Sequence, residues 1–176
     1  MSKAKLRKEL MLLSKEQLID LTLDAYAARR EVKEYFDFFL NPDVKKLQGK
    51  YLDMAFKEIN RTKYNRMKCR VSVLTKAMKD FASFDPGTEW VIATRISVFL
   101  QLIKACGDFY YTETIARYAV RLLTDIIIQA DRAATLGKFL PLLVKSIDSL
   151  RGADYLKQQL QEVLENASSL TNPINP

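Results

Sequence analysis

Apolar residues in this chain recur at steps of three and four, the spacing that places side chains on one face of an α-helix. The clearest stripe follows Ser14-Lys-Glu-Gln17, a sequence typical of a helix-capping box. We expect one helix of about 25 residues, roughly 38 Å long, because nothing interrupts the stripe until Pro42 disfavours helical geometry at Asn41. The residues of this stripe are Leu18, Leu21, Ala25, Ala28, Val32, Tyr35 and Phe39.

Shorter stripes precede and follow this segment. A short opening helix carries Leu6, Leu10 and Leu13. A third helix, which Asp43 can cap, carries Leu47, Tyr51, Met54 or Ala55, and Ile59. After a polar joint at residues 61–65, a fourth helix buries Val71, Leu74, Met78 and Phe81, and the sequence Asp85-Pro-Gly87 ends it.

Residues 90–106 are apolar almost all round, which is typical of a central helix covered on most sides. A strand is the alternative, because β-branched residues are frequent here. The length of the segment without an internal turn signal favours the helix.

Glycine and proline divide the remainder of the chain into three more amphipathic helices. Gly107 is expected as a left-handed C-cap, with Asp108 or Thr112 opening the next helix. Gly137 is expected to end that helix, and Pro141 to lie in the first turn of the following one. Gly152 separates the last helix, which carries Leu156, Leu160, Val163 and Leu164.

These segments predict an all-α fold of seven or eight helices, as an antiparallel bundle or a helical-pair superhelix. Only five Gly and five Pro occur in 176 residues, which disfavours many short strands. We expect one domain over residues 1–167, followed by an extended or disordered tail over residues 168–176.

The net charge of +7 is concentrated in residues 57–79, which hold eight basic side chains and one acidic one, Glu58. Two interpretations stay open. The segment is a binding site for a polyanion such as an RNA or DNA backbone, with Tyr64 available for stacking, or it is a solvated surface. The candidate binding residues are Lys57, Arg61, Lys63, Arg66, Lys68, Arg70, Lys76 and Lys79.

Residue types that carry catalysis are scarce. The chain has no histidine, which removes Ser-His and Cys-His nucleophiles and most zinc sites, and its five glycines are isolated, so there is no phosphate loop. We therefore expect no catalytic, cofactor-binding or metal-binding residues, and no enzyme. The carboxylates Glu31, Glu34, Asp37 and Asp43 match no calcium loop and are expected to pair with Lys33 or Arg30.

The sequence also carries signals about compartment. We expect no membrane-spanning helix and no secretion signal, because charges interrupt every long apolar stretch and occupy the N-terminus. Two cysteines without a disulfide framework fit a reducing cytoplasm. Cys69 lies between Lys68 and Arg70, which would lower its thiol pKa, whereas Cys106 is expected as a small buried hydrophobe.

Three stretches together resemble a known family. These are Leu13–Ile19, the run Glu31–Pro42 (EVKEYFDFFLNP), and Cys69–Phe84 with the later Gly107-Asp-Phe. They are similar to a family of uncharacterised bacterial proteins, common in Bacteroidetes and catalogued as a domain of unknown function, over roughly residues 5–125. The resemblance implies a small helical cytoplasmic protein without an established activity.

The function we expect is that of a non-enzymatic helical scaffold that binds another protein or a second copy of itself. The long apolar stripe and the apolar residues 115–164 supply more hydrophobic surface than internal packing accounts for. The alternative is a nucleic-acid-binding module that uses residues 57–79.

Overall fold

The computed structural model describes residues 2–171, with side chains described for residues 2–167, and 78% of it is helical. The all-α prediction is confirmed; besides helices, the described residues contain one two-stranded hairpin. The chain divides into two compact units, residues 1–43 and residues 44–176, and each is described by itself. Whether both unfold together as the one domain expected over residues 1–167 stays a prediction.

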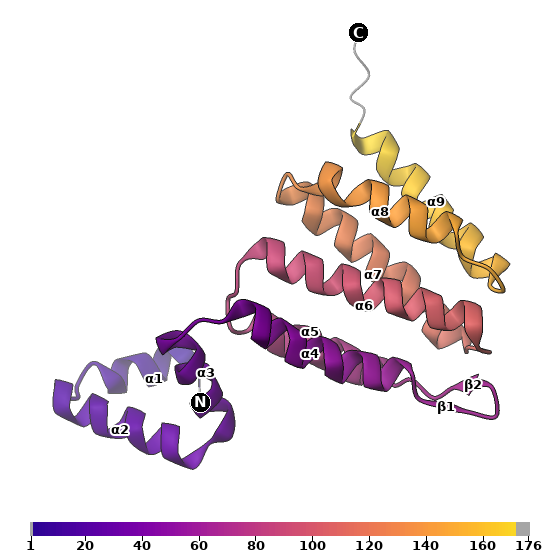
Figure 1. Cartoon of the computed structure of the whole chain (residues 1–176). Helices are drawn as coiled ribbons and strands as arrows, with labels where there is room; N and C mark the ends of the chain where they lie inside the picture. The colour runs from indigo at the N-terminus through magenta and orange to yellow at the C-terminus, as the bar shows by residue number, and fades with distance from the viewer. Residues whose placement is uncertain (1, 172–176) are drawn as a thin grey trace, which may run out of the picture. The chain divides into compact units, whose positions relative to one another are not determined.

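Unit 1, residues 1–43, holds three short helices (Figure 1): α1 (Lys3–Leu10), α2 (Lys15–Ala28) and α3 (Arg30–Leu40). The predicted capping box is confirmed. The Ser14 hydroxyl accepts from the Gln17 backbone N–H at 3.2 Å, and Gln17 Oε1 accepts from the Ser14 N–H at 2.9 Å. These bonds satisfy two donors at the start of α2.

The single long helix expected from Leu18 to Phe39 is wrong, because the chain breaks at Arg29. Its backbone is extended (φ −133°, ψ 118°), which ends α2 and begins α3. The break brings the Tyr26 hydroxyl within 2.8 Å of Asp37 Oδ1, to which it donates a hydrogen bond. In a continuous helix these residues would stand about 16 Å apart along the axis.

Unit 2 stacks its helices in consecutive pairs: α4 (Val44–Ile59) with α5 (Val71–Ala82), α6 (Thr88–Asp108) with α7 (Glu113–Arg132), and α8 (Leu136–Asp148) with α9 (Asp154–Thr171). Figure 1 shows the three pairs as successive layers. The hairpin β1 (Thr62–Lys63) and β2 (Arg66–Met67) joins α4 to α5 at one end of this stack.

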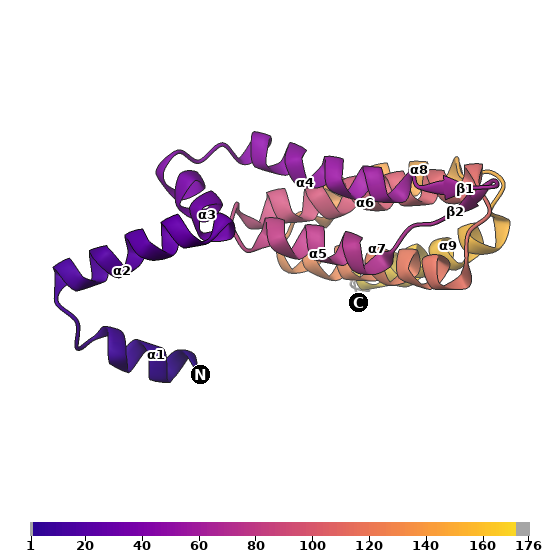
Figure 2. The same ribbon diagram turned by 90° about the horizontal axis from the view of Figure 1, so that it is seen from below.

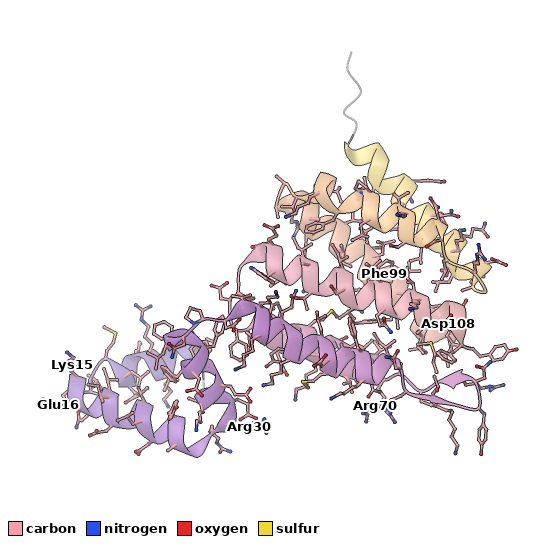
Figure 3. All side chains as sticks on the ribbon, viewed as in Figure 1. Lys15, Glu16, Arg30, Arg70, Phe99 and Asp108 are labelled. Carbon is pink, nitrogen blue, oxygen red and sulfur yellow. The ribbon has the colours of Figure 1, made fainter. Side chains whose placement is uncertain are left out.

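Helix α6 occupies the centre, in contact with α4 and α5 on one side and α7 and α8 on the other. It is a helix rather than a strand, as its length predicted. Phe99, labelled in Figure 3, is one of its fully buried side chains, and the others include Ile92 and Leu102. By length and composition α6 could cross a membrane, and half of that stretch is buried within the unit. The expectation of no membrane-spanning helix stays a prediction.

Gly152 (φ 75°) separates α8 from α9 as predicted, but Gly107, Gly137 and Pro141 lie at other positions in their helices than expected. Gly107 lies inside α6, and α6 ends with Phe109 as its C-cap. Gly137 and Pro141 both lie within α8, because α7 already ends at Arg132 and Ala134 makes the left-handed turn (φ 54°). Helix α9 continues to Thr171, so residues 168–171 of the expected tail are helical; residues 172–176 lie outside the described residues.

Gly107 allows the α8–α9 turn to approach α6 closely. A Cβ at Gly107 would lie 2.6 Å from the Arg151 carbonyl oxygen, and a Cβ at Gly152 would lie 2.6 Å from the Gly107 carbonyl oxygen. Two backbones therefore meet where neither residue can carry a side chain.

Replacement of Gly107 should separate these backbones. We expect Gly107→Ala to lower the free energy of unfolding by about 2 kcal/mol through overpacking, despite the better helix propensity of alanine. Gly49→Ala is the matched control, because Gly49 lies inside α4 with nothing within 4 Å of its missing Cβ. The control should stabilise the protein by about 0.5 to 1 kcal/mol in urea unfolding, and equal effects of the two changes would contradict the close approach.

Candidate interaction surfaces

The polar joint predicted at residues 61–65 forms a β-hairpin whose two-residue turn is Tyr64-Asn65. Both turn residues have positive φ (51° and 57°), as a type I′ turn requires. Asparagine suits this conformation, but a bulky aromatic residue adopts it at a cost in free energy. The Tyr64 side chain is 87% exposed, so its own packing does not offset that cost.

A second tyrosine joins this hairpin from the loop between α6 and α7. The Met67 N–H donates to the Tyr110 carbonyl at 2.8 Å, and the Tyr110 N–H donates to the Asn65 carbonyl at 3.0 Å. The Tyr110 side chain is 71% exposed. Figure 2 shows the hairpin and the α6–α7 loop at the same end of unit 2. Sequence reasoning missed Tyr110, although the run Phe109-Tyr110-Tyr111 between two helices was a signal for a short extended segment.

Glu58, at the end of α4, anchors the base of the hairpin. The Glu58 side chain is only 6% exposed. It accepts four hydrogen bonds, one from Arg61 Nη1 (2.8 Å) and three from Arg70, through Nε (3.0 Å), Nη2 (3.0 Å) and the backbone N–H (2.8 Å). The bonds from Arg70, followed by those from Arg61, hold the pKa of Glu58 down to about 2, although burial opposes the shift.

All eight basic residues of the predicted segment are exposed, but they do not form one cluster. Arg61, Lys63, Arg66, Lys68 and Arg70 gather at the hairpin, where the Lys68 N–H donates to the Arg61 carbonyl at 2.7 Å. Figure 3 labels Arg70 close to where the hairpin leaves the helices. Lys57 lies in the last turn of α4, and Lys76 and Lys79 lie on α5, about 9 and 14 Å along its axis from Arg70.

We name Arg61, Lys63, Tyr64, Arg66, Lys68, Arg70 and Tyr110 the hairpin surface. The Lys63 ammonium lies 5.2 Å from the centre of the Tyr64 ring, so a cation and an aromatic face adjoin at its tip. Asn65 and Tyr110 also line a hollow of about 500 Å³ that contains one acidic residue, Asp108. Asp108, labelled in Figure 3, ends α6 and is the carboxylate that would oppose a phosphate there.

Cys69 does not have the acidified thiol that its basic neighbours suggested. Burial, followed by the charge of Glu58, raises its pKa to about 11, against the smaller opposite effects of Arg61 and Arg70. The thiol pKa is therefore raised rather than lowered, because the anion that binds the two arginines also disfavours a thiolate. Cys106 is buried, as predicted, and burial raises its pKa to about 12.

The carboxylates of α3 behave as ordinary helix-surface groups. Arg30 Nε lies 3.1 Å from Glu34 Oε1, the pairing expected one turn along a helix, and Asp37 accepts from Tyr26. Among the residues that the structure describes, no group of three or more Asp, Glu or Cys is placed to hold a metal ion.

Unit 1 presents an apolar surface of a different kind. No residue of α1, α2 or α3 is buried. Phe36 and Phe38 are partly buried, whereas Phe39 of the predicted stripe is 68% exposed. The other exposed large apolar residues here are Leu6, Met11, Leu12, Ile19, Leu21, Leu23, Tyr35 and Leu40.

An apolar groove of about 470 Å³ runs along α1 to the start of α2. Leu6 and Leu10 line it from α1, Met11 from the C-cap position of α1, and Leu18 from α2. Lys3 and Arg7 also line it, so the groove has a positively charged border. Such a groove suits an apolar helix face that carries acidic residues.

We expect Glu58→Gln to lower the free energy of unfolding by about 2 kcal/mol at pH 7, because two arginines lose their shared anion. Since the folded-state pKa of Glu58 is lowered, its contribution is present above pH 4.5 and is lost as the pH falls towards 2. Urea unfolding between pH 7 and pH 2.5 should show this loss in the wild type and less of it in Glu58→Gln.

Glu113→Gln provides the matched control for this change. Its carboxylate also pairs with an arginine, Arg117, at 3.4 Å, but both side chains are largely exposed. The control should change the free energy of unfolding by less than about 1 kcal/mol. An equally large effect of both substitutions would show that the buried position of Glu58 is unimportant.

A protein-family model matches this chain over most of its length. The model of a family of unknown function (DUF6155) matches residues 1–113, so the resemblance expected over residues 5–125 covers unit 1, α4 to α6 and the hairpin, and α7 to α9 extend beyond it. No curated protein matches the chain. No solved structure matches it either. Both surfaces described above lie within the matched residues, and the chain belongs to this family of unknown function.

Proposed function

We propose that this protein is a non-enzymatic helical interaction protein whose unit 1 docks another protein. The observation that supports this proposal is the absence of any buried residue from α1, α2 and α3, although these helices and the joint between α1 and α2 expose nine large apolar side chains. A segment of about 40 residues without a core needs a partner to bury its apolar surface.

The contrast with unit 2 supports the same proposal. There Ile92, Phe99, Leu123 and Leu160 are fully buried, so the stacked pairs form a core of their own and can act as a rigid support. Two free cysteines agree with the reducing cytoplasm that we propose as its compartment.

Site-specific photo-crosslinking tests this proposal. A photoreactive amino acid at Leu12, which is 80% exposed in unit 1, should give a discrete adduct with one protein in cells that carry the gene. The matched control places it at Tyr155, which is 69% exposed in unit 2, and should give no such adduct. The absence of an adduct from Leu12, or equal adducts from both positions, would rule out unit 1 as the docking part.

A second candidate function is binding of single-stranded nucleic acid at the hairpin surface. Tyr64 and Tyr110 are both exposed and stand among five cations, of which one charge is balanced by Glu58. Exposed rings stack on unpaired bases and cations bind the backbone, a combination typical of single-strand binding. The strained turn that presents Tyr64 favours this reading over a merely solvated surface.

Fluorescence anisotropy with a labelled oligo-uridine and a duplex DNA tests this second candidate. We expect the single strand to bind more tightly, with affinity that falls steeply with salt. Tyr64→Ala and Tyr110→Ala should each weaken it by about fivefold or more, because each removes one stacked base. Tyr155→Ala is the control and should leave it unchanged. No binding at low salt would retire this candidate.

A further inference from the structure

Two helices of unit 1 carry surface stripes with the same residue spacing and opposite charge. On α1 the residues Lys3, Leu6, Arg7 and Leu10 follow the spacing of three, one and three that places them on one face. On α2 the residues Glu16, Ile19, Asp20 and Leu23 have the same spacing. Each residue of the α2 stripe lies 13 positions after one of the α1 stripe. Each basic residue thus corresponds to an acidic one, and each leucine of α1 to an apolar residue of α2.

Within one chain, the two stripes do not face each other. The groove along α1 is closed by Leu18 of α2, which points about 150° around the helix from the centre of the acidic stripe. The acidic stripe is therefore left facing elsewhere. Its apolar members are open to solvent, with Ile19 47% and Leu23 58% exposed.

The charges of the helices agree with this separation. Helix α1 carries four basic residues and one acidic residue, whereas α2 carries one basic residue and three acidic ones. One helix is thus positive and the other negative, although together they are nearly neutral. An external partner for α1 should be an acidic apolar helix, and the chain itself contains one.

We propose that a second copy of this chain is the occupant of the α1 groove, and that α1 of each copy pairs with the acidic stripe of α2 in the other. The proposal rests on the proposed function, because it names the protein that unit 1 docks. A two-fold axis makes the pairing reciprocal, so that each copy supplies one groove and one stripe and the assembly closes as a dimer.

Four apolar side chains, of which Leu6, Ile19 and Leu23 are exposed and Leu10 is half-buried, form each of two equivalent contacts together with four charges. The interface is therefore small. Leu6 and Leu10 from one copy cover Ile19 and Leu23 from the other, while Lys3 and Arg7 meet Glu16 and Asp20. An interface of this size and polarity gives a dissociation constant on the order of 10 µM. Exposed ion pairs also make it sensitive to salt.

Analytical ultracentrifugation of the full chain from about 1 to 100 µM is the test, this range spanning the expected dissociation constant. The wild type should approach twice the 20.3 kDa mass of one chain, and a rise from about 0.05 to 0.5 M NaCl should weaken the dimer severalfold. A mass of one chain throughout, or a mass that grows beyond two chains, would overturn the proposal.

Charge reversal distinguishes specific pairing of the two stripes from nonspecific association. Lys3→Glu with Arg7→Glu makes both stripes acidic, and Glu16→Lys with Asp20→Lys makes both basic, so each variant alone should bind itself at least about tenfold more weakly. A mixture of the two variants should recover the dimer, because every contact again joins opposite charges. Failure of the mixture to recover it, or unimpaired dimers of either variant alone, would contradict the pairing.

Far-UV circular dichroism should show wild-type helix content for both variants, since all four side chains are exposed. If a variant is not folded, the salt dependence of the wild type still decides the outcome. The crosslink at Leu12 separates this inference from the proposed function: an adduct with a different protein, beside a monomeric wild type, supports docking by unit 1 and overturns the second copy.

Discussion

The burial of α6 is the constraint on which unit 2 depends. This helix is apolar on nearly every side, so the hydrophobic effect requires neighbours around its whole circumference. Helices α4 and α5 cover one side and α7 and α8 another, which explains why the unit is built from stacked pairs. The close contact of Gly107 with the α8–α9 turn extends this covering to the end of α6.

At the hairpin, hydrogen bonds between polar groups hold the helices together. Glu58 is a buried carboxylate, and its four hydrogen bonds join the end of α4 to the start of α5 across the β-turn. The same anion binds two of the basic side chains and disfavours ionisation of Cys69. A segment that looks uniformly basic in sequence is therefore organised around its single acid, with Lys63 and Arg66 left at the tip.

The two units differ in how much of their apolar surface they bury. Unit 2 buries a continuous cluster of large apolar side chains, whereas unit 1 divides a long stripe into short helices and keeps most of its large apolar residues at the surface. Short helices without a core gain little from their own packing, since helix stability in proteins comes mainly from tertiary contacts. On this basis we propose a role in binding for unit 1, and the hairpin offers a second, charged surface.

The sequence by itself determined which segments of unit 2 are helical, because their apolar positions follow the helical period and must be buried. It did not determine where α6 ends or where α8 begins. The stripe of α5 is buried at Leu74, Met78 and Phe81 as predicted, with Val71 half-buried. The all-round apolar segment from residue 90 to residue 106 is the central helix that it predicted. The Ser14–Gln17 cap was equally predictable, because its hydrogen bonds join residues three apart. The family resemblance rested on local runs of the same kind.

Only the tertiary structure decided the features that join distant residues. The break at Arg29 leaves the periodicity of the stripe intact, so no count of apolar residues reveals it; the contact of Tyr26 with Asp37 across the break does. Tyr110 reaches the hairpin through backbone hydrogen bonds across more than 40 residues, and Glu58 reaches Arg70 across 12. Helical periodicity encodes which face is buried, but hydrogen bonds between separate elements depend on where the whole chain places them.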